Sequence, residues 1–457
     1  MLRTSDLNSK SDPNNYYSTF VQGQKIATVS SFTFESGAAL QQVPVAYSTW
    51  GALNPNRDNV LVVCHALTGS SDAMDWWRPL FGPGKALDST RYFIFCANVL
   101  GSPYGTASPL STNPSTGRPY GPTFPQSTVK DDVRYSAHKL SNRSQRLTLD
   151  RLHKQVLDAL GVQSVAAVIG GSMGGMTNLE WALSTPPGYV KNIVPIATSA
   201  YQGAWGISWS ETQRRAIYAD PVFKSGYYDP VPVGQPQSGL GTARMIAMLT
   251  YRSHSSFEAR FGRKLAASKK KILAPSIGVL PSPPSNDAES DTESVEDEPV
   301  KYSAQGYLDY QADKFLTRFD TNCYIHLTKK MDAHDITRGR VHTHNPTPTQ
   351  DDLQTVLSKA PPKALVIGVE SDVLFPISQQ IELARHLPES KFLALKSGDG
   401  HDGFLLEFDT LNKVIKEHLQ DVHPWVYEGP PNAEGEKEGA EHGVVNSVFG
   451  EAEGVEF

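Results

Sequence analysis

The segment at 170–175 sets one serine among four glycines and a methionine, a pattern that fits nucleophilic catalysis. It contains the motif G-x-S-x-G around Ser172. An apolar, β-branched-rich run at 165–169 precedes it, and apolar residues at helical spacing follow it at 176–183. A strand, a glycine-flanked serine and a helix form a nucleophile elbow, whose sharp turn exposes the serine hydroxyl. We therefore predict that Ser172 is a nucleophile; the alternative is an ordinary N-cap serine in a glycine-rich turn.

An acid and a histidine follow the serine in the order that a catalytic triad of this kind needs. Asp372 comes just after the predicted strand 364–369, and His401 follows the next predicted strand, at 392–395. Ser…Asp…His is the chain order of α/β-hydrolases. In this prediction His401 takes the proton of Ser172, and Asp372 fixes the tautomer of the imidazole and stabilises its charged form.

Three other residues compete for these two roles. Glu370 is the rival acid, two residues before Asp372. His65 is the nearest rival histidine, but it stands where an oxyanion loop is expected, and His386 is predicted to lie on a helix face. The order of the residues and their places after strands favour the pair Asp372 and His401.

An acyl-transfer site also needs two backbone N–H groups that point at the developing negative charge. In the elbow arrangement one donor is the residue after the nucleophile, which is Met173. The second donor should come from the loop at 65–69, which follows the apolar strand predicted at 59–64. Within this loop we predict Leu67 as the donor.

The elements around these residues predict an α/β fold with a mostly parallel sheet and an inserted helical lid. Antiparallel strands are expected between 25 and 60, helices at 242–251 and 306–330, and a last helix at 410–419. The loop at 100–126 is too long for a passive connector, so we expect it to pack near the site. The predicted divisions are a first core part at 25–200, a lid at 201–345 with a disordered acidic insertion at 268–299, a second core part at 346–425, and a disordered tail at 428–457.

Composition excludes several classes of function. The 457 residues carry a net charge of −6 without a basic stripe, which argues against nucleic acid and anionic membranes as partners. Cys64, Cys96 and Cys323 are too few and too scattered for a disulfide framework or a metal cluster, which indicates a reducing compartment. The N-terminal stretch lacks the apolar region of a secretory signal, and no run approaches the ~18–20 apolar residues of a membrane span. We expect a cytoplasmic protein.

Several longer segments together resemble homoserine O-acetyltransferases of the fungal type. The resemblance runs from about residue 28 to 419, and it is far more specific than G-x-S-x-G alone. The segments are HALTG (65–69), GPGKALD (82–88), NVLGSPYGT (98–106), GRPYGPTFP (117–125), GGSMGGM (170–176), LTYRS (249–253), DVLFP (372–376) and GHDGFLLE (400–407).

The resemblance implies an α/β-hydrolase core with a helical lid, usually in a homodimer joined through the lids. It implies ping-pong transfer of acetyl from acetyl-CoA to the hydroxyl of L-homoserine, in methionine biosynthesis, with acetyl-CoA as a substrate and no separate cofactor or metal. One departure is the stretch at 135–151, which the family usually lacks and which we interpret as an extra surface excursion.

The resemblance also assigns residues to the acceptor. Arg244 would hold the substrate carboxylate, Tyr251 would line the same site, and Asp402 would hold the amino group. A zwitterionic amino acid needs one cation and one anion at a fixed separation in its binding site. Arg244 and Asp402 are of the types that would supply this pair of charges.

Other functions of the same fold stay open at this point. They are serine O-acetyltransferase, homoserine succinyltransferase, an acetyltransferase for a deacetylated cephalosporin, and an esterase that admits water to the same triad. The pair Arg244 and Asp402 favours an amino-acid acceptor over water, and the complete triad argues against a non-catalytic binding module.

Overall fold

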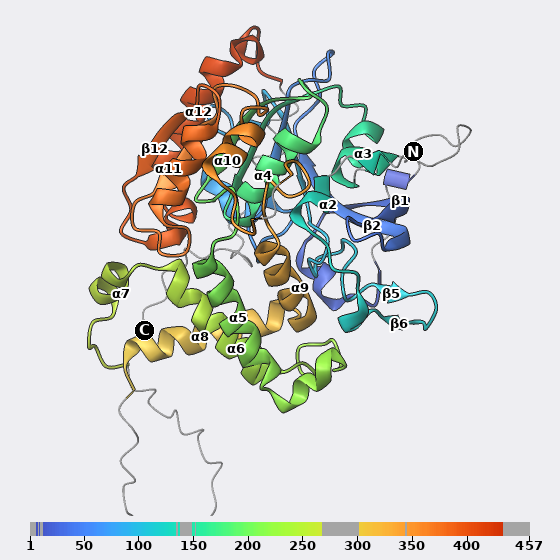
Figure 1. The fold of residues 1–457 in the computed structure, drawn as a ribbon, viewed down its shortest axis with the longest axis vertical. Helices are drawn as coiled ribbons and strands as arrows, with labels where there is room; N and C mark the ends of the chain where they lie inside the picture. Colours follow the sequence, from blue (N-terminus) through green and yellow to red (C-terminus); the bar gives the residue numbers. More distant parts are fainter. Residues whose placement is uncertain are drawn as a thin grey trace, which may run out of the picture.

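One eight-stranded sheet organises the molecule (Figure 1). The computed structural model describes residues 6–7, 9, 12–133, 136–137, 149–150, 152–266, 301–342 and 345–432. The strand order is β1-β2-β4-β3-β9-β10-β11-β12. β1 pairs antiparallel with β2 and β2 with β4, and every pair from β4 to β12 is parallel. The strands are β1 (Lys25–Thr33), β2 (Ala39–Trp50), β3 (Val60–Cys64), β4 (Phe93–Ala97), β9 (Val165–Gly171), β10 (Val190–Ile196), β11 (Leu365–Val369) and β12 (Lys391–Leu395).

Helices cover both faces of this sheet, so its central strands are apolar throughout. In β3 all five residues are buried, and alternate residues belong to two different hydrophobic cores: Leu61 and Val63 to one, Val60, Val62 and Cys64 to the other. A parallel strand buried on both sides reads as a continuous apolar run, which explains why the sequence indicated these strands. The helices of the core are α1 (Ala73–Trp77), α2 (Val129–Val133), α3 (Leu152–Ala159), α4 (Met173–Ser184), α10 (Gln350–Leu357), α11 (Ile377–His386) and α12 (Phe408–Val422).

After β10 the chain leaves the sheet, and the described residues from 204 to 332 include five α-helices, which we call the lid helices. Figure 1 shows them gathered on one side of the sheet, at 204–332. They are α5 (Ala204–Tyr218), α6 (Gln237–Tyr251), α7 (His254–Arg260), α8 (Ser303–Arg318) and α9 (Thr321–Asp332). The predicted helix at 306–330 is two helices, because the chain is extended at Phe319 and Asp320, where the Asp320 carboxylate caps α9.

Short elements complete the described fold. They are the 3₁₀ helices η2 (Tyr16–Phe20), η3 (Arg78–Leu80), η4 (Gly121–Thr123), η5 (Pro221–Gly226), η6 (Gly400–Leu405) and η7 (Pro424–Tyr427), and the strand pairs β5 (Thr112–Asn113) with β6 (Arg118–Pro119) and β7 (Ser136–Ala137) with β8 (Leu149–Asp150). The last pair belongs to the excursion at 135–151, most of which lies outside the described residues. The acidic insertion predicted at 268–299 also lies outside them. Of the predicted tail at 428–457 the structure describes 428–432, which bonds to Thr90 and Arg91.

The loop at 100–126 was expected to pack near the site, and Arg318 joins it to that region by contacting both the Tyr104 hydroxyl and the carbonyl of Thr68. None of its residues lines the pocket that contains Ser172. Instead, the Tyr104 hydroxyl donates to the carbonyl of Arg318 at the end of α8, and the loop borders a groove on the outer side of α9. Its aromatic side chains therefore connect the core to the lid helices rather than contact the site.

Candidate active site

Ser172 lies at the turn from β9 into α4, in a backbone conformation that few residues adopt. Its φ is 58° and its ψ is −126°. Such a strained conformation persists only where the surrounding structure holds the residue in it. Neighbouring backbone leaves no space for side chains on either side: a Cβ at Gly170 would lie 2.4 Å from the Gly174 carbonyl oxygen, and one at Gly174 would lie 2.1 Å from the Cys64 carbonyl oxygen. The two motif glycines thus allow the elbow to pack against β3.

His401 and Asp372 meet beyond the ends of β11 and β12, although 29 residues separate them. The Nδ1 of His401 is 2.8 Å from Oδ2 of Asp372. The other carboxylate oxygen, Oδ1, accepts hydrogen bonds of 2.9 Å from the backbone N–H groups of Leu374 and Phe375. These bonds fix the carboxylate, which in turn fixes the orientation of the imidazole.

Burial of His401 works to lower its pKa, but the Asp372 carboxylate outweighs burial, with help from Asp402. The result is a pKa above the ordinary value for histidine. An imidazole in this setting holds a proton more firmly, which suits a group that must take a proton from a hydroxyl and keep it through a transition state.

The rivals for these roles lie elsewhere. Glu370 is exposed on the turn after β11. His386 is half-buried on α11, where its ring contacts Gln350 and Gln354. His65 is buried behind the loop that carries Leu67.

Ser172 and His401 line one pocket, and Ala66, Leu67 and Thr68 form part of its wall. Within the described residues the Ser172 hydroxyl makes no hydrogen bond to His401, a contact that often tightens only when substrate binds. The N–H groups of Leu67 and Met173 also have no hydrogen-bond acceptor in the described part of the chain. The pocket therefore brings together Ser172, His401 and Leu67, and Met173 directly follows Ser172 at the start of α4.

Asp402 lines the same pocket and is only 2% exposed. Its Oδ2 lies 3.0 Å from Nε of Arg252, the residue that follows α6. Arg252 also contacts Asp399, at 3.2 Å. One buried cation, which was not among the predicted site residues, thus joins two carboxylates of the segment that carries His401. The signal was present in LTYRS, where a cation directly follows a predicted substrate residue.

Tyr251 lies in the wall of the pocket, whereas Arg244 does not reach it. Tyr251 lines it, and its ring centroid is 6.1 Å from that of His401. The guanidinium carbon of Arg244 lies 5.6 Å from the Tyr251 ring centroid and 4.9 Å from that of Phe315. Arg244 is 1% exposed and is not among the pocket-lining residues, so it lies behind Tyr251.

Most of the remaining wall comes from lid residues that the sequence did not single out. They include Gln202, Trp209, Gln213, Thr328 and Met331. Their contribution depends on how α5 and α9 pack over the sheet, and nothing in their types or spacing marks it.

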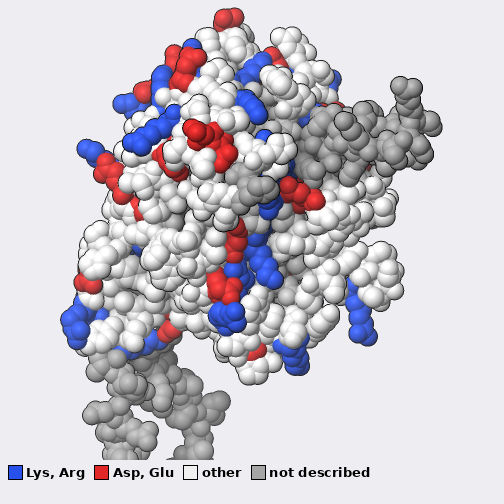
Figure 2. Space-filling model, viewed as in Figure 1, with Lys and Arg blue, Asp and Glu red and all other residues white. Residues whose placement is uncertain are grey.

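The described residues contain no group of three or more His, Cys, Asp and Glu side chains placed to hold a metal ion. No described helix has the length and apolarity to cross a membrane. Figure 2 shows Lys and Arg interspersed with Asp and Glu over the described part of one face, rather than gathered in a single basic area.

Comparison with known proteins agrees with the α/β fold of the chain. Residues 59–408 match the family model for the alpha/beta hydrolase fold. A homoserine O-acetyltransferase of Cryptococcus neoformans is 43% identical and aligns with 97% of each chain, and that of Saccharomyces cerevisiae is 43% identical over 95% of this chain and 94% of its own. Among solved structures, a homoserine O-acetyltransferase from Bacillus anthracis matches 87% of this chain and 97% of its own with a TM-score of 0.67. Its identity of 24% makes that last match a likeness of fold.

Proposed function

The chain belongs to the homoserine O-acetyltransferase family of the α/β-hydrolase fold, and on this premise we propose that it transfers acetyl from acetyl-CoA to L-homoserine through an acetyl group on Ser172. The observation that carries the proposal is the 2.8 Å contact between His401 and Asp372 at the pocket that also contains Ser172. The product would serve methionine biosynthesis, the role of this family.

In the first half-reaction the Ser172 oxygen attacks the thioester carbonyl while Nε2 of His401 takes the hydroxyl proton. The N–H groups of Leu67 and Met173 stabilise the negative oxygen of the tetrahedral intermediate, together with the N-terminus of α4. The intermediate collapses, the carbon–sulfur bond breaks, and His401 returns the proton to the departing thiolate. Acetyl-Ser172 and free CoA result.

In the second half-reaction His401 takes the proton of the homoserine hydroxyl, whose oxygen attacks the acetyl carbonyl. The ester bond to Ser172 breaks, and the serine oxygen recovers the proton from His401. Asp402, at the pocket wall, would bind the substrate ammonium, with Arg252 holding the carboxylate in place from behind. Tyr251 would line the acceptor site.

Arg244 would attract the substrate carboxylate. It lies behind Tyr251, so direct contact would require the Tyr251 ring to move aside, and otherwise the attraction acts across the ring. A buried guanidinium in a low-dielectric site acts over such a distance more strongly than one in water.

Support for a homodimer comes from large apolar side chains exposed on lid helices: Trp205 and Ile207 on α5 and Leu249 on α6. A cytoplasmic location is supported by three cysteines that are all free and buried, as is usual in a reducing compartment.

The proposal is tested by measuring thiol release from acetyl-CoA with homoserine, serine or water as acceptor. We expect homoserine to be used far better than serine or water. Ser172→Ala should release no thiol beyond the rate without enzyme and should carry no acetyl group by mass spectrometry. Acetylation of another residue of the wild-type protein would contradict the mechanism.

Arg244→Ala, with Arg244→Lys as its matched control, tests the acceptor site. The alanine variant should form the acetyl-enzyme normally but use homoserine poorly, by about 100-fold in kcat/KM, a loss typical of a charged contact. The lysine variant keeps the charge and should retain more of the activity. If the alanine variant lost both half-reactions together, the assignment of Arg244 to the acceptor would be wrong.

A further inference from the structure

Behind the oxyanion loop lies a buried chain of polar groups that the mechanism above does not use. It begins on α9, the lid helix that also contributes Thr328 and Met331 to the pocket wall. Lys330 on this helix and Asp132 on α2 form an ion pair of 2.5 Å, and both side chains are 0% exposed. Because burying two charges is expensive, a pair of this kind needs further hydrogen bonds to persist.

Those further bonds converge on the peptide groups of Leu100. Its N–H donates to Oδ1 of Asp132 at 2.8 Å, and its carbonyl accepts from Nζ of Lys330 at 3.1 Å. The next residue, Gly101, has a φ of +89°, and a Cβ there would lie 2.1 Å from the His326 ring on the same helix. The ion pair and the close approach of α9 therefore fix the backbone of the loop after β4.

This fixed backbone reaches the oxyanion loop through one histidine. The N–H of Val99 lies 3.1 Å from Nε2 of His65, and Nδ1 of His65 lies 2.8 Å from the carbonyl oxygen of Ala66. Because the Val99 amide can only donate, Nε2 must accept, so the proton resides on Nδ1 and is donated to Ala66. Burial lowers the pKa of His65 to about 4, which keeps the ring neutral and able to accept from Val99 at pH ~7.

The carbonyl of Ala66 and the N–H of Leu67 belong to one planar trans peptide, so they point in opposite directions. A hydrogen bond that holds this carbonyl toward His65 therefore turns the Leu67 N–H away from His65. The same bond polarises the peptide and makes its N–H a better donor. Gly69 also donates to the Ala66 carbonyl, and Arg318 of α8 donates to the carbonyl of Thr68, so the loop is held at two further points.

We propose that His65 is a positioning residue that aims the Leu67 N–H into the oxyanion hole, and that the Lys330–Asp132 pair anchors it from the lid helix α9. The inference rests on the proposed function, since it assumes that an oxyanion forms beside Leu67. It makes the lid a structural support of the acyl-transfer site as well as a wall of the pocket.

The experiment compares His65→Asn, His65→Gln and His65→Ala. The amide nitrogen of asparagine can occupy the place of Nδ1 and donate to Ala66, whereas the amide oxygen of glutamine can occupy the place of Nε2 and accept from Val99. Each variant is mixed rapidly with acetyl-CoA, and the first-turnover release of CoA is followed over a range of acetyl-CoA concentrations. Thermal unfolding of each variant shows that the measurement is made on folded protein.

We expect His65→Ala to slow acyl-enzyme formation by about 10- to 100-fold, because a donor displaced by about 1 Å loses that much, while half-saturation by acetyl-CoA changes little. His65→Asn should recover most of the rate, and His65→Gln should recover much less, even where the two variants unfold at similar temperatures. A histidine with a purely structural role would lower the unfolding temperature and leave the rate of the folded enzyme unchanged.

Two outcomes would overturn the inference: a wild-type acylation rate in folded His65→Ala, or equal rates in the asparagine and glutamine variants. If the alanine variant does not fold, the comparison of asparagine with glutamine decides alone. Failure of the proposed function would look different, because the wild-type protein itself would then release no CoA and carry no acetyl group on Ser172.

Discussion

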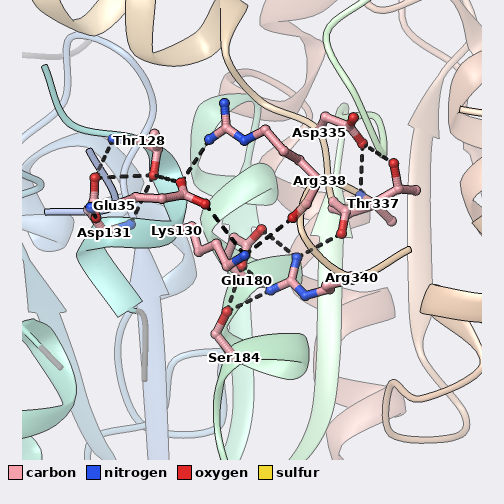
Figure 3. A network of polar contacts seen from close by, with 11 residues as sticks. Glu35, Thr128, Lys130, Asp131, Glu180, Ser184, Asp335, Thr337, Arg338 and Arg340 are labelled. Carbon is pink, nitrogen blue, oxygen red and sulfur yellow. Dashed lines mark hydrogen bonds and ion pairs between the residues drawn. The ribbon is translucent and has the colours of Figure 1, made fainter. Parts of the chain in front are cut away.

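Two neighbouring aspartates on α2, Asp131 and Asp132, belong to ion-pair networks that differ in how far water reaches them. Asp132 forms the inner pair with Lys330, where neither side chain is exposed. Asp131 accepts from the N–H of Glu35, which leads to the outer network of Glu35, Lys130 and Arg338. Figure 3 shows this outer network reaching from α2 to the segment that follows α9.

In the outer network the charged side chains are 17–43% exposed, and its contacts are 3.6 Å for Lys130 and 2.8 Å for Arg338. An intermediate case is the pair of Arg340 with Glu180 on α4, also drawn in Figure 3, at 13% and 2% exposure. All three connect the chain near the end of the lid to the core. The comparison teaches that exposure, more than the number of ion pairs, should decide which connection the fold depends on.

The largest effect is expected at the inner pair. Lys330→Met leaves the Asp132 carboxylate buried without its cation, so the free energy of unfolding should fall by about 3–5 kcal/mol in urea titrations. The double variant Lys330→Met/Asp132→Asn removes the stranded charge but keeps an oxygen for the Leu100 N–H. It should therefore be more stable than the single variant, and a double variant less stable than Lys330→Met would contradict this account.

The intermediate effect is expected at Glu180, whose two carboxylate oxygens bind Arg340 at 3.0 and 2.5 Å. Glu180→Gln should cost about 2 kcal/mol at pH ~7, the range for hydrogen bonds to a charged group. Burial works to raise the pKa of Glu180, but Arg340 outweighs it, and the pKa lies below its ordinary value of 4.5.

Because folding lowers the pKa of Glu180, the loss of stability in Glu180→Gln should depend on pH. A carboxyl group whose pKa is lowered by folding contributes its full stability above the ordinary value of 4.5 and loses it as the pH falls through the folded-state pKa. The difference in unfolding free energy between wild type and Glu180→Gln should therefore shrink below about pH 4.5. A difference that stayed constant down to about pH 2 would show that the charge of Glu180 is not the cause.

Features that depend on local sequence, or on strands ending at one edge of a sheet, could be predicted from the sequence. The elbow at Ser172 was predictable because a strand, a tight turn and a helix are local patterns. Asp372 and His401 were predictable because parallel strands end at one edge of a sheet. The α/β fold is confirmed for similar reasons, by a parallel sheet whose buried strands read as apolar runs.

The contacts that the lid helices make with the core could not be predicted from local sequence patterns. Arg252 pairs with Asp402 across 150 positions of sequence, and the Lys330–Asp132 pair spans 198, the differences between their residue numbers. The loop at 100–126 was expected to pack near the site, but its contacts with the lid helices were not predictable, since its length and composition do not encode which surface its aromatic residues meet. Helix packing decides these partners, and one sequence does not reveal it.

The smallest effect is expected in the outer network, at Arg338, whose side chain is 43% exposed. Arg338→Ala removes its contact with Glu35 but leaves Glu35 with Lys130, Thr128 and water. The free energy of unfolding should therefore fall by less than about 1 kcal/mol, and even this difference should vanish at ~1 M salt, where exposed charges are screened within about 3 Å. Urea titrations at low and high salt measure both quantities. A loss above about 2 kcal/mol that did not change with salt would mean that Arg338 stabilises the fold as a buried ion pair does. The exposed fraction of the side chains would then not predict how much each connection between lid and core contributes to stability.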